Sequence, residues 1–157
     1  MLKRIRSWTS RRAHYGPVSA VDVPKSAPDG EAVYVGTTIG GSAHQKVGGA
    51  LFGRGECRYW LQGGALTFQR GGGGGPGLQA RSGPAIALTG ITEVGLSGAH
   101  AGQVMAPNRI AIVTWRLGQD EVDTGFGFDN PIQAEAFADR VAAVAGLSPD
   151  KGPHASA

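Results

Sequence analysis

Residues 109–147 constrain the fold more than any other part of the sequence. In the first half, RIAIVTWRL, apolar and β-branched residues alternate between two faces with the two-residue period of a strand. Gly118, Gln119 and Asp120 then supply turn chemistry. In residues 121–128, Val and Phe positions alternate with acidic residues and then with glycines. The pattern predicts an antiparallel hairpin with one buried face.

A helix is predicted directly after this hairpin. Asn130 suits the N-cap, Pro131 the first helical position and Gln133 the partner position of a capping box. Gly146 supplies a stop signal. An apolar stripe is formed by Ala134, Phe137, Val141 and Val144. A helix of this length needs tertiary support, so the stripe is expected to dock on the preceding sheet.

Several short strands are predicted upstream, joined by glycine-rich turns. They cover Glu31–Ile39, Glu56–Leu61, Ala65–Arg70, Pro84–Leu88 and Ile91–Leu96. Gly63 and Gly64 can adopt the positive φ angles of a tight turn, and Gly98–Asn108 is expected to be a loop. Because helices do not alternate with strands, the sequence predicts a mainly β fold with one C-terminal α-helix.

The two-residue period also assigns faces within the first predicted strand. It places Ala32, Tyr34 and Gly36 on one face, and Val33, Val35 and Thr37 on the other. Trp60 and Trp115 are expected to pack inside the barrel or against the helix, with exposure as a partner anchor as the alternative.

Composition divides the chain into three parts. Residues 1–30 are predicted to be a basic N-terminal arm and a Pro/Gly linker, since Pro17, Pro24 and Pro28 interrupt any regular element there. Residues 31–147 form the predicted domain, and residues 148–157 are predicted to be a disordered tail.

Positive charge is concentrated in the arm. The net charge is +3, of which residues 1–12 supply +5 with no acidic residue, so residues 13–157 carry −2. This argues against a nucleic-acid-binding face on the domain. Leu2, Ile5 and Trp8 recur every three residues among the basic ones, as in a short amphipathic segment lying on an anionic membrane. The alternative is a solvated terminus.

No cofactor or metal site is predicted. The lone Cys57 excludes an internal disulfide and a cysteine-based zinc site, and it is read as a plain strand residue. No run of eighteen apolar residues is present, and residues 1–20 lack the apolar core of a signal peptide. Residues 71–77, GGGGGPG, lack the Gly-Lys-Ser/Thr ending of a phosphate-binding loop and are read as a hairpin loop.

No catalytic residue is predicted either. The histidines, His14, His44, His100 and His154, fall in presumed loops or tails and are read as solvated. The acidic cluster around the last hairpin is read as a solubility feature, with acid–base chemistry or cation binding as the alternative. It consists of Asp120, Glu121, Asp123 and Asp129. The chain is therefore predicted not to be an enzyme.

An antiparallel barrel with one C-terminal helix is the architecture of the pleckstrin-homology (PH) superfold. The segments YVGTTIGG, IALTGITEV and IVTWRLGQDEVDTGF resemble the bacterial PH-like family of actinobacterial membrane- or transport-associated proteins. The resemblance covers residues 31–147 and implies a PH-like antiparallel β-barrel or bent sheet capped by the helix. Proteins of this family frequently carry an N-terminal membrane helix, whereas this sequence shows only a basic segment there, which leaves open whether its start is truncated. PH domains that bind phosphoinositides place a dense Lys/Arg cluster in the first hairpin, whereas the corresponding loop here offers only Lys46, Arg54 and Arg58 among glycines, so a specific inositol-phosphate pocket is not expected.

The resemblance implies a non-enzymatic interaction module that binds a protein partner or an anionic membrane surface, and no nucleic acid. The expected setting is the cytoplasm, peripheral to the inner face of the plasma membrane. The residues expected to make partner or lipid contacts are Lys3, Arg4, Arg6, Lys46, Arg54, Arg58, Arg70 and Arg81. The alternative is a small β-barrel ligand-binding protein or enzyme that uses the barrel interior, which a core filled by Trp60, Phe68, Ile86 and Trp115 would rule out.

Overall fold

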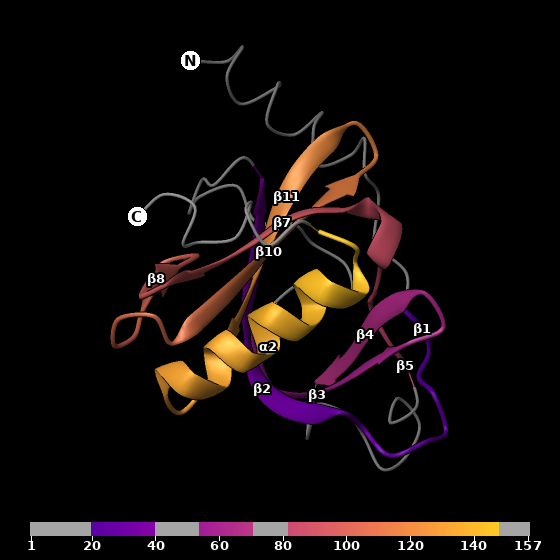
Figure 1. The fold of residues 1–157 in the computed structure, drawn as a ribbon, viewed down its shortest axis with the longest axis horizontal. Coiled ribbons are helices and arrows are strands. Elements are labelled where there is room, and N and C mark those ends of the chain that lie inside the picture. The colour runs from indigo at the N-terminus through magenta and orange to yellow at the C-terminus, as the bar shows by residue number, and fades with distance from the viewer. Residues whose placement is uncertain (1–19, 40–53, 71–81, 148–157) are drawn as a thin grey trace, which may run out of the picture.

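The computed structural model describes residues 20–39, 54–70 and 82–147. A seven-stranded antiparallel sheet with the order β6-β4-β3-β2-β11-β10-β7 forms its centre, and one α-helix, α2, follows it (Figure 1). The sheet strands are β2 (Gly30–Ile39), β3 (Gly55–Gln62), β4 (Ala65–Arg70), β6 (Ala85–Ala87), β7 (Ile91–Ser97), β10 (Ile110–Leu117) and β11 (Asp120–Gly127). The remaining elements are β1 (Val21–Asp22), β5 (Ser82–Gly83), the 3-10 turn η2 (Leu88–Gly90), β8 (Ala99–His100), β9 (Gln103–Val104) and α2 (Pro131–Val144).

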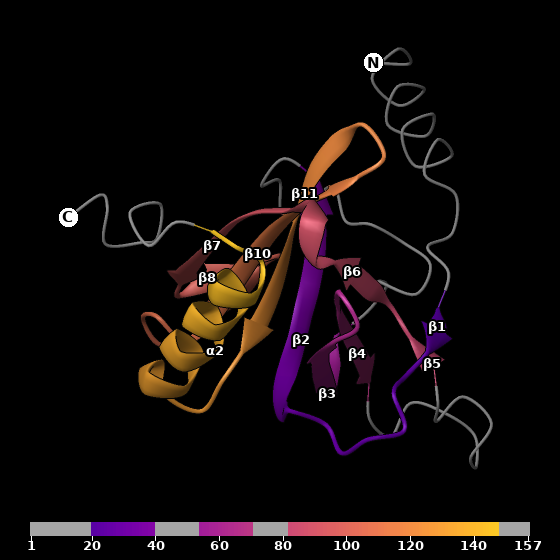
Figure 2. The ribbon, with the colours of Figure 1, turned by 45° about the vertical axis from the view of Figure 1, so that its right-hand side comes forward.

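The sheet bends at β2, which is shared by two groups of strands. One group is β3, β4 and β6, and the other is β11, β10 and β7. The first half of β2 pairs with β3, and the second half pairs with β11 (Figure 2). β6 and β7 are the two edges and do not pair with each other, so the sheet is bent but not closed. The prediction of a mainly β fold with one C-terminal helix is confirmed, in its bent-sheet form.

The ends of α2 follow the sequence signals. The Asn130 side chain accepts a hydrogen bond from the Gln133 amide at 2.9 Å, and Pro131 occupies the first turn. After the helix, Gly146 has a φ of +73°, and the Leu147 amide bonds to the Ala142 carbonyl oxygen at 2.9 Å. A left-handed residue at this position satisfies the last carbonyl groups of a helix.

One residue of the predicted stripe was assigned wrongly. Ala134, Phe137 and Val141 are buried, but Val144 is 46% exposed, and Ala138 is buried in its place. Each residue turns a helix by about 100°, which places Val144 about 80° from Ala134 and Ala138 only about 40° away. Val144 therefore lies at the rim of the buried face.

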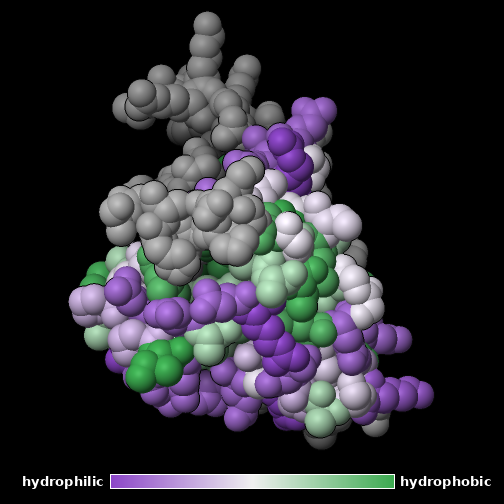
Figure 3. Space-filling model, in the orientation of Figure 1, coloured by the Kyte–Doolittle hydropathy of each residue, from purple (hydrophilic) through white to green (hydrophobic). Residues whose placement is uncertain are grey.

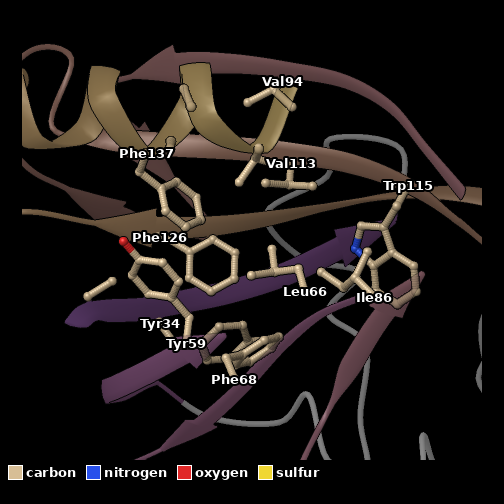
Figure 4. Packing of buried hydrophobic residues seen from close by; sticks show 14 of the residues in the cluster. Tyr34, Tyr59, Leu66, Phe68, Ile86, Val94, Val113, Trp115, Phe126 and Phe137 are labelled. Carbon is tan, nitrogen blue, oxygen red and sulfur yellow. The ribbon is translucent and has the colours of Figure 1, made fainter. Parts of the chain in front are cut away.

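The buried face of α2 plugs the space between the two groups of strands. The Phe137 ring lies 5.2 Å from that of Phe126 in β11 and 4.9 Å from that of Tyr59 in β3. Behind them, the Phe68 ring lies edge-to-face with Phe126 at 5.1 Å and stacks on Tyr34 at 5.0 Å (Figure 4). These distances are those of packed aromatic pairs, so the rings themselves fill the interior.

Trp60 is buried, but it lies outside this interior. Cys57 and Tyr59 join the core cluster, so Trp60 faces the opposite side of β3, where it is 4% exposed. Its indole Nε1 donates to the Ser26 carbonyl oxygen at 2.9 Å. Residues preceding β2 thus cover Trp60. Asp29, one of these residues, holds them against β3 because its carboxylate accepts a hydrogen bond from the Leu61 amide at 2.6 Å. The boundary at residue 31 stays a prediction.

A β-bulge changes the faces predicted for β2. Thr37 pairs with Thr124, but Tyr34 pairs with Phe126, so Val35 is an extra residue in the ladder. Tyr34 and Thr37 consequently both face inward, and their side-chain oxygens lie 2.7 Å apart. Strict alternation assigned them to opposite faces, which is wrong because a bulge reverses the pattern beyond it.

Replacement of Phe137 tests the packing of α2 against the sheet. We expect Phe137→Ala to lower the free energy of unfolding by about 3–5 kcal/mol, since truncation of a packed core aromatic leaves a cavity. The control on the same helix is Ile132→Ala, whose side chain is 81% exposed. Its effect should stay within about 0.5 kcal/mol in urea unfolding. Equal effects of the two changes would contradict this packing.

Candidate interaction surface

Three of the eight predicted contact residues lie in the described part of the chain: Arg54, Arg58 and Arg70. Lys3, Arg4, Arg6, Lys46 and Arg81 fall outside the described residues, as do His14, His44, His154 and the loop of residues 71–77. The three described arginines belong to β3, β4 and the residue before β3.

Arg54 and Arg58 are both exposed, in different surroundings. The Arg54 guanidinium donates to the side-chain oxygen of Gln103 in β9. Arg58 stands in β3 between Glu31 of β2 and Gln69 of β4 in the strand register. A carboxylate neighbour therefore offsets part of the Arg58 charge.

Arg70 points the other way. It pairs with the buried Cys57 across β3 and β4, and its guanidinium carbon lies 5.8 Å from the centroid of the Tyr34 ring. That is cation–π distance. Because Arg58 and Arg70 lie on opposite faces of the β3–β4 hairpin, these two arginines do not converge into one anion pocket.

The interior carries polar groups that satisfy one another. Trp115 Nε1 donates to Thr124 Oγ1 at 2.8 Å, and Thr124 Oγ1 lies 2.8 Å from Thr37 Oγ1, which in turn contacts Tyr34. Burial raises the pKa of Tyr34, and it raises the pKa of the Cys57 thiol to about 12. Both groups stay protonated at neutral pH, which agrees with Cys57 as a plain strand residue.

His100 was read as a solvated loop histidine, and that reading is wrong. Residues 99–104 form the β8–β9 hairpin, and the imidazole is only partly exposed. Its Nε2 lies 3.2 Å from the Gly36 carbonyl oxygen and 3.1 Å from that of Asp123. Both partners are acceptors, so Nε2 carries the hydrogen. Burial lowers the pKa of His100.

Glycines make room for this hairpin on the outer face of the sheet. A Cβ atom at Gly125 would lie 2.6 Å from His100 Cδ2, and one at Gly127 would lie 2.8 Å from Met105 Sδ. The sequence held a signal for this contact, namely two glycines at alternate positions on the face opposite the core. Such a pattern marks a close approach by another segment.

Carboxylates gather at the other end of the outer face. We call Glu93, Glu121 and Asp123 the acidic face. Asp120 alternates with Glu121 and belongs to the opposite side of the β10–β11 hairpin, where it pairs with Leu117, and Asp129 lies beside the N-cap of α2. Thr114 Oγ1 donates to Asp123 Oδ1 at 2.6 Å, and Thr92 Oγ1 donates to Glu121 Oε2 at 2.9 Å. The tip of the β10–β11 hairpin is accordingly hydrophilic (Figure 3).

The described residues as a whole are acidic. They contain seven Lys and Arg against eleven Asp and Glu, a net charge of −4. Within these residues, no group of three His, Cys, Asp or Glu side chains is placed to hold a metal ion. None of their helices combines the length and the apolar character that crossing a bilayer requires.

Comparison with known proteins gives a family. Residues 17–142 match a family model described as bacterial PH domain-like. Among solved structures, the chain is similar to the PH domain from TgAPH, with a TM-score of 0.44 and 15% sequence identity over 90% of this chain and 91% of that one. No curated protein matches. The family match runs from before β1 almost to the end of α2 and agrees with the resemblance seen in the sequence.

The glycine contact can be tested with a matched pair. Gly125→Ala should loosen the β8–β9 hairpin and speed amide hydrogen exchange in residues 99–104, because the new methyl group overlaps the His100 ring. A Cβ at Gly95 of β7 meets nothing within 4 Å. Gly95→Ala should therefore leave exchange in the hairpin unchanged, and equal exchange in the two variants would contradict the contact.

The pKa of His100 predicts a pH effect on stability. The folded-state pKa of His100 is lower than the ordinary value of 6.5. The contribution of the neutral imidazole to the free energy of unfolding is therefore complete above pH 6.5 and is lost as the pH falls toward the folded-state pKa. Wild type should lose more unfolding free energy between pH 7 and pH 5 than His100→Gln, whose amide can donate but does not titrate. Parallel pH profiles would contradict the assignment.

Proposed function

The chain belongs to the bacterial PH-domain-like family, and from this premise we propose that it is a non-enzymatic interaction module for an anionic membrane surface or a protein partner. The observation that carries the membrane part is the separation of charge. Residues 1–12 hold five positive charges, whereas the described residues carry a net charge of −4. Attraction to anionic lipid therefore belongs to the arm.

The arm has the chemistry for weak, reversible attachment. A basic side chain near an anionic leaflet contributes about 1 kcal/mol, so five contribute on the order of 5 kcal/mol at low salt. Leu2, Ile5 and Trp8 add apolar contacts if the segment lies in the interface. The cytoplasmic leaflet of the plasma membrane is the matching surface, because its lipids are anionic.

Among the three described arginines that were expected to make contacts, Arg58 is the best placed to support the arm. It is exposed and forms no ion pair within the described ranges, whereas Arg54 is bonded to Gln103 and Arg70 lies against Tyr34. Lys46 and Arg81 remain proposed contacts. The sparse charge favours general electrostatic attraction over recognition of one lipid headgroup.

The alternative, a ligand carrier or enzyme that uses the interior, has less support. Such a protein needs a cavity with convergent polar groups. Here Phe68, Ile86 and Trp115 occupy the interior as buried side chains, and the polar groups bond to one another.

Sedimentation with vesicles at low salt tests the membrane proposal. The triple variant Lys3→Gln, Arg4→Gln, Arg6→Gln should bind vesicles containing phosphatidylserine about 100-fold more weakly than wild type, at about 1 kcal/mol per charge. Arg58→Gln should weaken binding by no more than about fivefold.

Two results would oppose the membrane proposal. One is unchanged binding after deletion of residues 1–12, and the other is absence of wild-type binding at low salt. The protein-partner part would then remain, and affinity capture from the native host with Arg58→Gln as a control would test it.

A further inference from the structure

The acidic face is a continuous row of acceptors across the outer side of the sheet. In the strand register, Asp123 of β11 lies beside Thr114 of β10, and Thr114 lies beside Glu93 of β7. Glu121 shares this face because it is two residues from Asp123. Arg116, opposite Glu121, is the basic residue within these strands. A net negative charge remains on the face.

A buried hydroxyl group without a partner extends this row. Thr38 of β2 pairs with Asp123, and both point outward because their neighbours Thr37 and Thr124 bond to each other inside the sheet. Thr38 is 0% exposed, and its Oγ1 has no hydrogen-bond partner among the described residues. Native proteins rarely leave a buried hydroxyl unsatisfied, so this one points to a ligand that hydrogen-bonds beside Asp123.

The chemistry of the row suits a basic side chain. Ionised carboxylates only accept hydrogen bonds, and the Thr38 hydroxyl can accept as well. The Asp123 carboxyl group is only partly buried, so a donor can approach it from solvent while Thr114 holds Oδ1. An ammonium or guanidinium group brings several donors and the complementary charge.

The chain supplies such groups itself. From Arg12 to Ala20, where the description begins, eight residues span up to about 26 Å when extended. A domain of this size has a radius of gyration of about 13–15 Å, which corresponds to a diameter of about 34–39 Å for a compact sphere. The nine residues from Lys3 to Arg12 add up to about 30 Å, so the basic side chains of the arm can reach the acidic face. We propose that residues 1–12 dock on the acidic face of the same molecule, with a Lys or Arg side chain bound by Asp123 and Thr38.

This docking would regulate the proposed membrane binding, and in that respect it rests on the proposed function. The arm cannot contact the acidic face and an anionic membrane at once. Apparent affinity for vesicles falls by the fraction of molecules whose arm is free. If about one molecule in ten has a free arm, removal of the acidic face raises vesicle affinity about tenfold.

The helix provides a control of equal charge. Asp129, Glu135 and Asp139 are exposed acidic residues on or beside α2, and no buried unpartnered hydroxyl is recorded there within the described ranges. Neutralising these three changes the net charge by the same amount as neutralising Glu93, Glu121 and Asp123. A general effect of charge will change arm docking equally in both triple variants, whereas loss of a docking site will change it only in the acidic-face triple.

Paramagnetic relaxation in the full-length chain tests the docking without any membrane. A nitroxide attached at Ser7→Cys leaves the native Cys57 unlabelled, because Cys57 is 2% exposed with a pKa of about 12. The label should broaden the amide signals of residues 120–123 selectively. The broadening should disappear in the triple variant Glu93→Gln, Glu121→Gln, Asp123→Asn and persist in the helix triple Asp129→Asn, Glu135→Gln, Asp139→Asn.

Broadening spread evenly over the domain, or unchanged in the acidic-face triple, would overturn the docking proposal. Thr38→Val, which keeps the side-chain shape, should also weaken the broadening at residues 120–123. Vesicle sedimentation of the same variants separates the two proposals. Selective broadening without vesicle binding supports the docking and refutes membrane binding, whereas vesicle binding without selective broadening does the reverse.

Discussion

The bulge in β2 is the constraint on which the rest of the structure depends. Because Val35 is extra in the ladder with β11, Tyr34 and Thr37 both enter the interior. Tyr34 then stacks on Phe68, while Thr37 continues the hydrogen-bond chain to Thr124. Bulges also increase the local bend and twist of a strand. The same strand can therefore pair with β3 at one end and β11 at the other, which gives the sheet its bent form.

A filled interior determines where function can reside. Tyr34 and Cys57 are buried with raised pKa values, and the hydroxyl groups next to them are bonded. The outer face is also partly covered, by residues before β2 over Trp60 and by the β8–β9 hairpin over Gly125. The acidic face and the surface around Arg58 remain among the exposed polar regions, which directs attention to electrostatic contacts.

Much of this fold was predictable because it follows from local chemistry. The Asn130 cap, the Gly146 stop and the strand Ala65–Arg70 appear where the sequence signals place them. The bulge was missed, although Gly36 inside the strand was a signal for one, since a strand-interior glycine often marks a bulge. Only the pairing with β11 shows that Val35 is the extra residue. Contacts of the candidate site that join distant segments were missed for the same reason.

His100 and Trp60 illustrate this limit. His100 meets the Gly36 carbonyl oxygen 64 residues away, and Trp60 meets Ser26 across 34 residues. Residue type alone could not distinguish a docked imidazole from a solvated one. Arg58 and Arg70 were likewise both expected to contact the partner or lipid, and strand parity, once the register is known, places them on opposite faces.

Separation of charge is the central claim of the functional account: a basic arm joined to an acidic domain. Its most direct test is the dissociation constant of the full chain for vesicles with and without phosphatidylserine at low and high salt. We predict binding to the anionic vesicles that weakens by at least about tenfold from about 50 to 300 mM salt, because screening acts on exposed charges. Equal affinity at the two salt concentrations, or equal affinity for neutral vesicles, would contradict the account.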